Sequence, residues 1–169
     1  MHDSSYLKMK SFKEKFLDKN MELKILDVGS LGEYNYRDIF DEQKWSYVGL
    51  DIKNGPNVDL IIDDIYNWAE IEDNSYDVII SGQFFELLEY FWLTMVEVER
   101  VLKPNGYVCI IVPSSGPNHC NDLNGYKFYE DGIRALAKYV NLDIVQSYVD
   151  NSINAKPWHD ACLIAKKSK

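Results

Sequence analysis

Two glycines and an acid near the start of the chain have the types and spacing of a cofactor site. Gly29 and Gly32 interrupt an apolar run that predicts a buried parallel strand over residues 23–28. Glycine allows a sharp turn and lets backbone N–H groups approach a ligand closely. A second predicted strand, residues 46–50, is followed by Asp51, whose carboxylate can accept hydrogen bonds from both hydroxyls of a ribose. A glycine turn with a strand-end acid about 20 residues later indicates a nucleoside-containing cofactor.

Strands and helices alternate along the chain after a leading helix. Residues 5–19 have the pattern of an amphipathic helix, and we expect residues 1–22 to form a helical extension packed on a domain of residues 23–169. The predicted strands are 23–28, 46–50, 58–62, 76–81, 106–112, 142–149 and 160–166. The predicted helices are 34–40, 65–70, 84–102 and 130–140.

This alternation predicts an α/β fold, with a mostly parallel seven-stranded sheet and helices on both faces. No helix separates the last two predicted strands, which indicates an antiparallel strand at one edge of the sheet. In such a sheet, ligands bind beyond the carboxyl ends of the strands.

The composition is that of one acidic domain. The 169 residues suffice for a single domain with a sizeable core, and 46% of them are apolar. The net charge is −9, and the only basic run is at residues 166–169. Because nucleic-acid binding needs a basic face, we do not expect polymeric DNA or RNA as a partner.

Cysteine usage and hydropathy predict an intracellular protein. Cys109, Cys120 and Cys162 have no C-x-x-C spacing and are odd in number, so neither disulfides nor a metal site is expected. No apolar run reaches membrane-spanning length, and the first residues lack the apolar core of a signal peptide. We therefore expect no membrane insertion and a cytoplasmic location.

Further segments follow the glycine turn and Asp51 in a set order. They are Asp63-Asp64, Ser81-Gly82-Gln83 and Val101-Leu102-Lys103-Pro104-Asn105-Gly106-Tyr107. In this order the sequence resembles the class I S-adenosylmethionine-dependent methyltransferases, specifically the type 11 methyltransferase-domain family. The resemblance covers roughly residues 23–166 and implies a single-domain Rossmann-like fold with S-adenosylmethionine as cofactor and S-adenosylhomocysteine as product.

Within that family the chain looks most like a subgroup associated with glycan and surface-polysaccharide biosynthesis. The matching segments are Tyr47-Val48-Gly49-Leu50-Asp51-Ile52, Gly55-Pro56-Asn57-Val58-Asp59, Ile80-Ser81-Gly82-Gln83, Pro113-Ser114-Ser115-Gly116-Pro117-Asn118-His119 and Lys127-Phe128-Tyr129-Glu130-Asp131-Gly132. Many relatives carry Glu-His after the fourth strand, whereas this chain has Glu86-Leu87.

The resemblance assigns roles to the residues at the strand ends. Asp51 would hold the ribose hydroxyls, and either Asp63 or Asp64 would face the adenine amino group. Asp27 would support the glycine turn, which lies over the methionine and ribose part. The implied cofactor set is Asp27, Gly29, Ser30, Gly32, Asp51, Ile52, Asp63, Asp64, Ser81 and Gln83.

A dinucleotide-dependent dehydrogenase is the competing interpretation of the turn. The segment from Gly29 to Gly32 lacks the third glycine that allows a helix to pack closely beneath a pyrophosphate. Glu33 follows the turn and would repel a pyrophosphate, whereas it tolerates the amino or sulfonium charge of S-adenosylmethionine. The methyltransferase interpretation is therefore favoured.

The acceptor side is expected in two later segments. His119 follows a central strand and is the candidate general base, because histidine accepts a proton at neutral pH. Asp160 would orient His119 or bind the substrate. Tyr126 and Lys127 are candidate substrate contacts, with Lys127 suited to a phosphate or carboxylate. The sequence also allows structural roles for these residues. His119 would then fix a turn, Asp160 would belong to a structural pair, and Lys127 would be a solvated loop lysine.

The predicted function is methyl transfer to a small acceptor, with oxygen on a sugar, sugar nucleotide or related precursor as the favoured target. The other hypothesis is a catalytically weak, cofactor-binding subunit that scaffolds a biosynthetic complex, because Leu87 stands where relatives have histidine. The sequence leaves open whether the chain forms a homo-oligomer.

Overall fold

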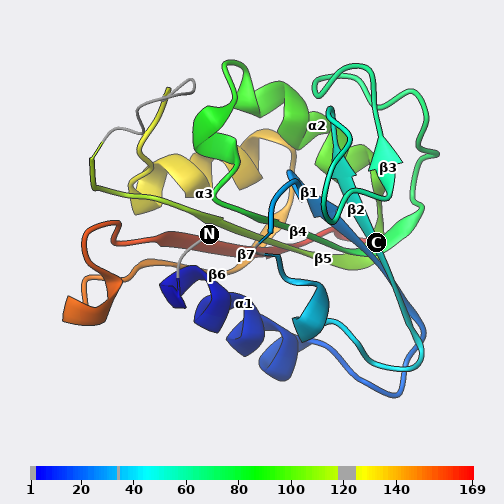
Figure 1. The fold of residues 1–169 in the computed structure, drawn as a ribbon, viewed down its shortest axis with the longest axis horizontal. Coiled ribbons are helices and arrows are strands. Elements are labelled where there is room, and N and C mark those ends of the chain that lie inside the picture. Colours follow the sequence, from blue (N-terminus) through cyan, green and yellow to red (C-terminus); the bar gives the residue numbers. More distant parts are fainter. Residues whose placement is uncertain (1–2, 34, 118–124) are drawn as a thin grey trace.

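The computed structural model describes residues 3–33, 35–117 and 125–169. They form one seven-stranded sheet with helices on both faces (Figure 1). The strands are β1 (Leu23–Val28), β2 (Trp45–Asp51), β3 (Leu60–Ile61), β4 (Tyr76–Gly82), β5 (Leu102–Val112), β6 (Asp143–Val149) and β7 (Ala161–Lys166). The helices are α1 (Asp3–Phe16), α2 (Phe91–Val101) and α3 (Glu130–Tyr139), with 3-10 turns η1 (Arg37–Ile39), η2 (Phe85–Leu87) and η3 (Ile153–Ala155). The predicted α/β class is confirmed.

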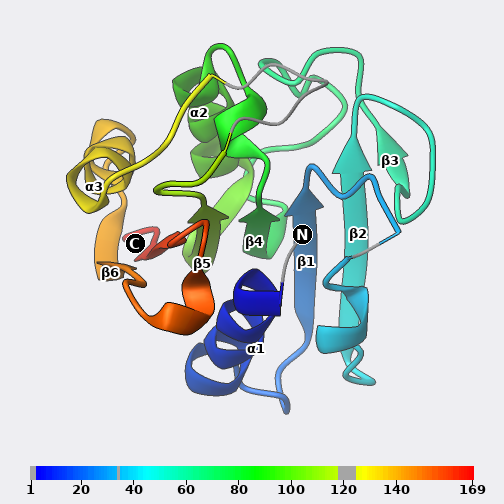
Figure 2. The same cartoon turned by 60° about the vertical axis from the view of Figure 1, so that its left-hand side comes forward.

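The strand order in the sheet is β3-β2-β1-β4-β5-β7-β6. The pairs from β3 to β5 are parallel, and β7 is antiparallel to both β5 and β6. The predicted antiparallel strand is thereby confirmed, and it lies one position in from the edge. In Figure 2 the arrowheads of β1, β2 and β4 point the same way. Because the chain order reverses between β1 and β4, the crevice beyond their carboxyl ends is where this fold binds ligands.

Successive side chains of a strand point to opposite faces of the sheet, so the core has one apolar layer on each face. Leu26 and Val28 of β1 pack on the face that α2 and α3 cover, whereas Ile25 packs on the opposite face. On that opposite face, Met9 and Phe12 of α1 are fully buried. Figure 1 shows α1 on the side of the sheet opposite α2 and α3. The leading helix is therefore part of the core. No helix within the described ranges is long and apolar enough to cross a membrane.

The helix predicted over residues 65–70 is wrong. Side chains of α2 take the backbone groups that a helix would pair internally: the Trp68 N–H donates to Glu97 Oε2 at 3.0 Å, and Arg100 Nη2 donates to the Trp68 carbonyl at 2.8 Å. Thr94 Oγ1 donates to the Ile65 carbonyl at 3.1 Å. These long-range bonds stabilise an irregular segment despite its local helical pattern.

The long helix predicted over residues 84–102 is divided into η2 and α2. Between them, the N–H groups of Glu89 and Tyr90 donate to the Tyr66 hydroxyl at 3.1 and 3.3 Å. Gln83, just before η2, has a positive φ of 60°. For the predicted helix 34–40, the described residues contain only the short turn η1.

Candidate cofactor and acceptor site

The turn after β1 has no backbone donor left for a ligand. Gly29 takes the left-handed φ of 80° that glycine tolerates. The N–H groups of residues 29–32 all donate to oxygens of the protein. Their acceptors are the Leu50 carbonyl for Gly29 (2.9 Å) and Ser30 (3.1 Å), the Asp51 carboxylate for Leu31 (3.3 Å) and the Pro56 carbonyl for Gly32 (3.2 Å). A pyrophosphate needs such donors, so the turn fits a cofactor without phosphate groups.

Asp51 is held in one orientation at the end of β2. One carboxylate oxygen accepts the N–H of Leu31 at 3.3 Å and the other accepts the N–H of Lys53 at 3.2 Å. Each carboxylate oxygen can accept a further hydrogen bond, so the pair suits the two hydroxyls of a ribose. The adjacent side chain, Ile52, is 45% exposed and offers an apolar surface for a base. These residues fit the nucleoside half of S-adenosylmethionine.

The structure distinguishes the two acids after β3. Asp64 Oδ1 accepts the Tyr66 N–H at 2.8 Å, and the Asp64 carbonyl accepts the Asn67 N–H at 3.1 Å, so Asp64 closes a turn. Asp63 is exposed, and its carboxylate has no hydrogen-bond partner in the described part of the chain. Asp63 is therefore the better candidate for the adenine amino group.

We expect Asp63→Ala to weaken binding of S-adenosylhomocysteine about fivefold, because one hydrogen bond contributes about 1 kcal/mol. Asp64→Asn is the matched control, since its amide oxygen still accepts the Tyr66 N–H. Calorimetric titration of both variants measures the difference. A larger loss for Asp64→Asn than for Asp63→Ala would reverse the assignment.

Asp27 lies beneath the turn and is 3% exposed. Burial raises the pKa of its carboxyl to about 7, although the Tyr47 hydroxyl donates to it and Arg37 lies near enough to lower the pKa. The Arg37 guanidinium stacks over the Tyr47 ring at 4.6 Å and pairs with Asp59. The Asp27 carboxyl group thus joins β1 to β2 through Tyr47, and its support of the turn stays a prediction.

The free energy of unfolding should fall as the pH rises from about 4 to about 7. Over this range native Asp27 keeps a proton that the unfolded chain releases, so the native state loses up to about 4 kcal/mol of relative stability. Glu86, whose pKa burial also raises to about 7, acts in the same direction. Denaturant unfolding of Asp27→Asn at several pH values should give a shallower slope, and Asp27→Asn/Glu86→Gln a shallower one still. An unchanged slope in both would contradict these pKa shifts.

The polar residues at the end of β4 differ in what they contact. Ser81 is 2% exposed, and its hydroxyl donates to the Val28 carbonyl at 2.8 Å, which joins β4 to β1. The Gln83 side chain donates through Nε2 to Asp160 Oδ1 at 3.0 Å. Gln83 is therefore fixed beside the carboxyl end of β4.

Asp160 is fully buried and joins three elements. Besides Gln83, the Ser4 hydroxyl donates to its Oδ2 at 2.6 Å, and Lys8 Nζ lies 3.7 Å from the same oxygen. Lys8 also pairs with Asp150 at 2.7 Å. The network connects α1, β4 and the start of β7. His119, the predicted partner of Asp160, lies outside the described residues.

The segment after residue 124 lies beside the residues that follow β4. The Tyr126 hydroxyl donates to the Glu89 carbonyl at 3.0 Å, and its ring packs edge-on against Phe91 at 4.7 Å. The Lys127 ammonium stands 5.2 Å from the centre of the Trp158 ring. Tyr126 therefore packs on η2 and α2, and the Lys127 charge stays beside Trp158.

Sequence reasoning gave no role to Glu86, whose environment in the structure is unusual. Its side chain is 2% exposed, and Oε2 has no hydrogen-bond partner among the described residues. The available signal was one acid inside the apolar run Phe84-Phe85-Glu86-Leu87-Leu88.

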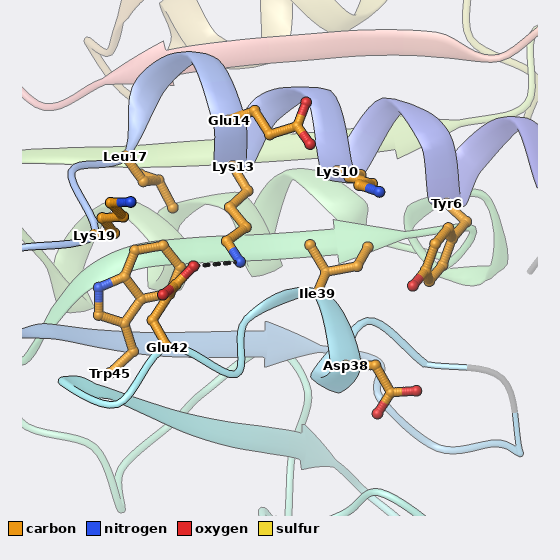
Figure 3. A pocket seen from close by; sticks show the side chains of 10 residues that line it. All are labelled: Tyr6, Lys10, Lys13, Glu14, Leu17, Lys19, Asp38, Ile39, Glu42 and Trp45. Atoms are coloured by element: carbon orange, nitrogen blue, oxygen red, sulfur yellow. Dashed lines mark ion pairs between the residues drawn. The ribbon is translucent and has the colours of Figure 1, made fainter.

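A cavity of about 420 Å³ lies away from these residues (Figure 3). It is lined by Tyr6, Lys10, Lys13, Glu14, Leu17, Lys19, Asp38, Ile39, Glu42 and Trp45. Trp45 is the first residue of β2, so the cavity extends toward the amino ends of the strands. Figure 3 shows Lys13 pointing to Glu42, with which it pairs at 2.8 Å. The cavity is separate from the predicted cofactor site.

Comparison with known proteins gives a family match and a shared fold. Residues 26–110 match the family described as a methyltransferase domain. No curated protein sequence is significantly similar to the chain.

Three solved structures illustrate the shared fold. A Haloferax volcanii methyltransferase in complex with the activator Trm112 has a TM-score of 0.74 at 14% identity, with 99% of this chain and 92% of that chain covered. The Burkholderia thailandensis 1,6-didemethyltoxoflavin N1-methyltransferase, with S-adenosylhomocysteine bound, has a TM-score of 0.71 at 16% identity over 98% and 85%. An S-adenosylmethionine-dependent methyltransferase of Aquifex aeolicus has a TM-score of 0.63 at 14% identity over 98% and 97%.

Proposed function

The chain belongs to the methyltransferase-domain family and is an S-adenosylmethionine-dependent methyltransferase, and we propose that it methylates an oxygen of a small acceptor. The acceptor we propose is a sugar, a sugar nucleotide or a related polysaccharide precursor. The observation that carries the cofactor assignment is the turn of residues 29–32, whose N–H groups are all used internally, beside the oriented carboxylate of Asp51.

The cofactor supplies an electrophilic methyl group on a positively charged sulfur. The chain contributes alignment of the acceptor and exclusion of water from the reacting atoms. We assign ribose binding to Asp51, adenine recognition to Asp63 and Ile52, and the methionine end to the surroundings of Gln83. Gln83 suits that role because Asp160 fixes its side chain at the carboxyl end of β4.

His119 remains our proposal for a residue that contacts the acceptor. It follows the segment after β5, and its imidazole suits proton transfer at neutral pH. The buried position of Asp160 among Ser4, Lys8 and Gln83 supports a positioning role for that carboxylate.

The proposal that the acceptor carries an anionic group rests on Lys127. Its ammonium lies over the Trp158 ring, near Glu86 and the strand ends, where it can pair with a phosphate or carboxylate. Sugar nucleotides and uronic acids combine such an anion with free hydroxyls. The resemblance of segments such as 113–119 to the polysaccharide-associated subgroup supports the same acceptor class.

The test is tritium transfer from methyl-labelled S-adenosylmethionine to uridine diphosphate sugars, uronic acids and matching neutral sugars. We expect turnover of an anionic acceptor, with Lys127→Gln raising its KM about tenfold and leaving the kcat within about twofold, since one charged hydrogen bond contributes about 1.5–3 kcal/mol. Lys138→Gln, an exposed lysine in the last turn of α3, is the control. Labelling of an amine or of a neutral sugar alone would contradict the acceptor class.

A second candidate function is a cofactor-binding subunit that works with a protein partner. The Haloferax volcanii methyltransferase of similar fold is complexed with an activator, and the exposed side chains Trp92, Leu93 and Val96 lie together on α2. This candidate predicts cofactor binding without turnover by the isolated chain.

A cytoplasmic location is part of both proposals, and the buried free thiols of Cys109 and Cys162 are consistent with it.

A further inference from the structure

We propose that Glu86 is a catalytic residue whose carboxylate takes the proton of the acceptor's nucleophilic hydroxyl. The inference rests on the proposed function, because it presupposes a hydroxyl acceptor at the carboxyl end of β4. It assigns the proton to Glu86 in place of His119, which then contacts the acceptor without taking its proton.

The backbone fixes Glu86 close to the cofactor turn. Glu86 lies in η2, which begins three residues after the end of β4, and its carbonyl accepts the N–H groups of Gly125 at 3.1 Å and Tyr126 at 3.3 Å. Two residues earlier, the Phe84 ring occupies the space beside Gly29: a Cβ added there would lie 2.2 Å from that ring. The segment of Glu86 is therefore packed directly on the glycine turn.

The Glu86 carboxyl group is buried like a core residue, but one of its two oxygens, Oε2, lacks a hydrogen-bond partner among the residues that the structure describes. The side chain is 2% exposed. An unpaired buried polar oxygen destabilises the folded chain, and such groups in native proteins call for an explanation such as a catalytic role. A proton-accepting role gives this oxygen a partner when the acceptor binds.

The charges near Glu86 suit this role. Burial raises the pKa of its carboxyl to about 7, while a hydrogen bond from its own backbone N–H and the charge of Lys127 lower the pKa and Asp160 raises it. At pH 7 about half of the carboxyl groups are ionised and able to accept a proton. A base with a pKa near the working pH combines a high ionised fraction with basicity, and such a group contributes roughly 10²–10⁴-fold to a rate.

The step balances without a further reactant. The O–H bond of the acceptor breaks as its proton passes to Glu86 Oε2, and an oxygen lone pair forms the new bond to the methyl carbon. The carbon–sulfur bond breaks with its electron pair left on sulfur, which yields the methyl ether and S-adenosylhomocysteine. The proton on Glu86 then passes to water.

Water is the smallest hydroxyl acceptor, so the test needs no identified substrate. The purified chain is incubated with methyl-tritiated S-adenosylmethionine in buffer, and tritiated methanol is counted. The variants are Glu86→Gln, which keeps the volume and removes the base, and Glu89→Gln, an exposed acid in the same segment. Titration with S-adenosylhomocysteine verifies that both variants keep the cofactor site.

We expect methanol release by the chain and by Glu89→Gln, and release at least tenfold slower by Glu86→Gln, with unchanged affinity for S-adenosylhomocysteine in both variants. The release should rise with pH through about 7 only when Glu86 is present. Equal release by the three proteins, including none above buffer, would overturn the role of Glu86. Failure of the unmodified chain to bind S-adenosylhomocysteine would instead overturn the proposed function.

Discussion

Gly29→Ala should destabilise the chain and abolish measurable binding of S-adenosylhomocysteine. The residue has a φ of 80°, and an added Cβ would lie 2.2 Å from a ring carbon and 2.7 Å from the Cβ of Phe84. Left-handed backbone in an alanine and overpacking against a fixed neighbour together cost about 2–4 kcal/mol. Moving Phe84 would also disturb the turn that carries the N–H bonds to Leu50.

Gly132→Ala is the matched control, because no atom lies within 4 Å of its added Cβ. Gly132 is in α3, so alanine there should leave the affinity unchanged and raise the free energy of unfolding by up to about 1 kcal/mol. Urea unfolding and calorimetric titration of the two variants give both quantities. A Gly29→Ala protein as stable and as tightly bound as Gly132→Ala would mean that the turn is not the rigid support described above.

Asp51→Asn should weaken the binding of S-adenosylhomocysteine by about 10- to 150-fold. The change removes the charge that strengthens hydrogen bonds from the ribose, which are worth about 1.5–3 kcal/mol when one partner is ionised. In the unmodified chain the N–H groups of Leu31 and Lys53 both donate to the Asp51 carboxylate. The substitution places an amide NH₂, which cannot accept a hydrogen bond, opposite one of them. Asp131→Asn, at the exposed start of α3, should leave the affinity unchanged.

A double cycle with the 2′-deoxy analogue of S-adenosylhomocysteine isolates the ribose contact. The unmodified chain should prefer the ribose form by at least tenfold, and Asp51→Asn should show little preference. An equal preference in both proteins would place the ribose away from Asp51, even if the variant binds more weakly overall.

Strands such as β1 could be predicted from the sequence because they are short apolar runs that the tertiary structure leaves intact, whereas β3 is shorter than predicted and β5 begins earlier. Residues 23–28 were assigned correctly as β1 from their apolar side chains and the glycine that follows. Residues 65–70 could not be assigned correctly, because their backbone groups are bound by Glu97 and Arg100, about 30 residues further along the chain. Such long-range side-chain bonds leave no local pattern.

Some residues of the candidate site could likewise be predicted from the sequence, and others could be found only in the structure. The position of Asp51 after a strand is a local feature, so the sequence sufficed to propose it. The buried partners of Asp160 come from residues as distant as Ser4, and the unpaired oxygen of Glu86 depends on what packs around η2. The choice between Asp63 and Asp64 also required the structure, because only there does Asp64 close a turn.

Calorimetric titration of the unmodified chain with S-adenosylhomocysteine, and separately with NAD, shows which of these two ligands the glycine turn and Asp51 bind. The saturated N–H groups of residues 29–32 and the ribose-ready carboxylate of Asp51 predict micromolar binding of S-adenosylhomocysteine and no binding of NAD at the same concentrations. Binding of NAD without binding of S-adenosylhomocysteine would contradict the account.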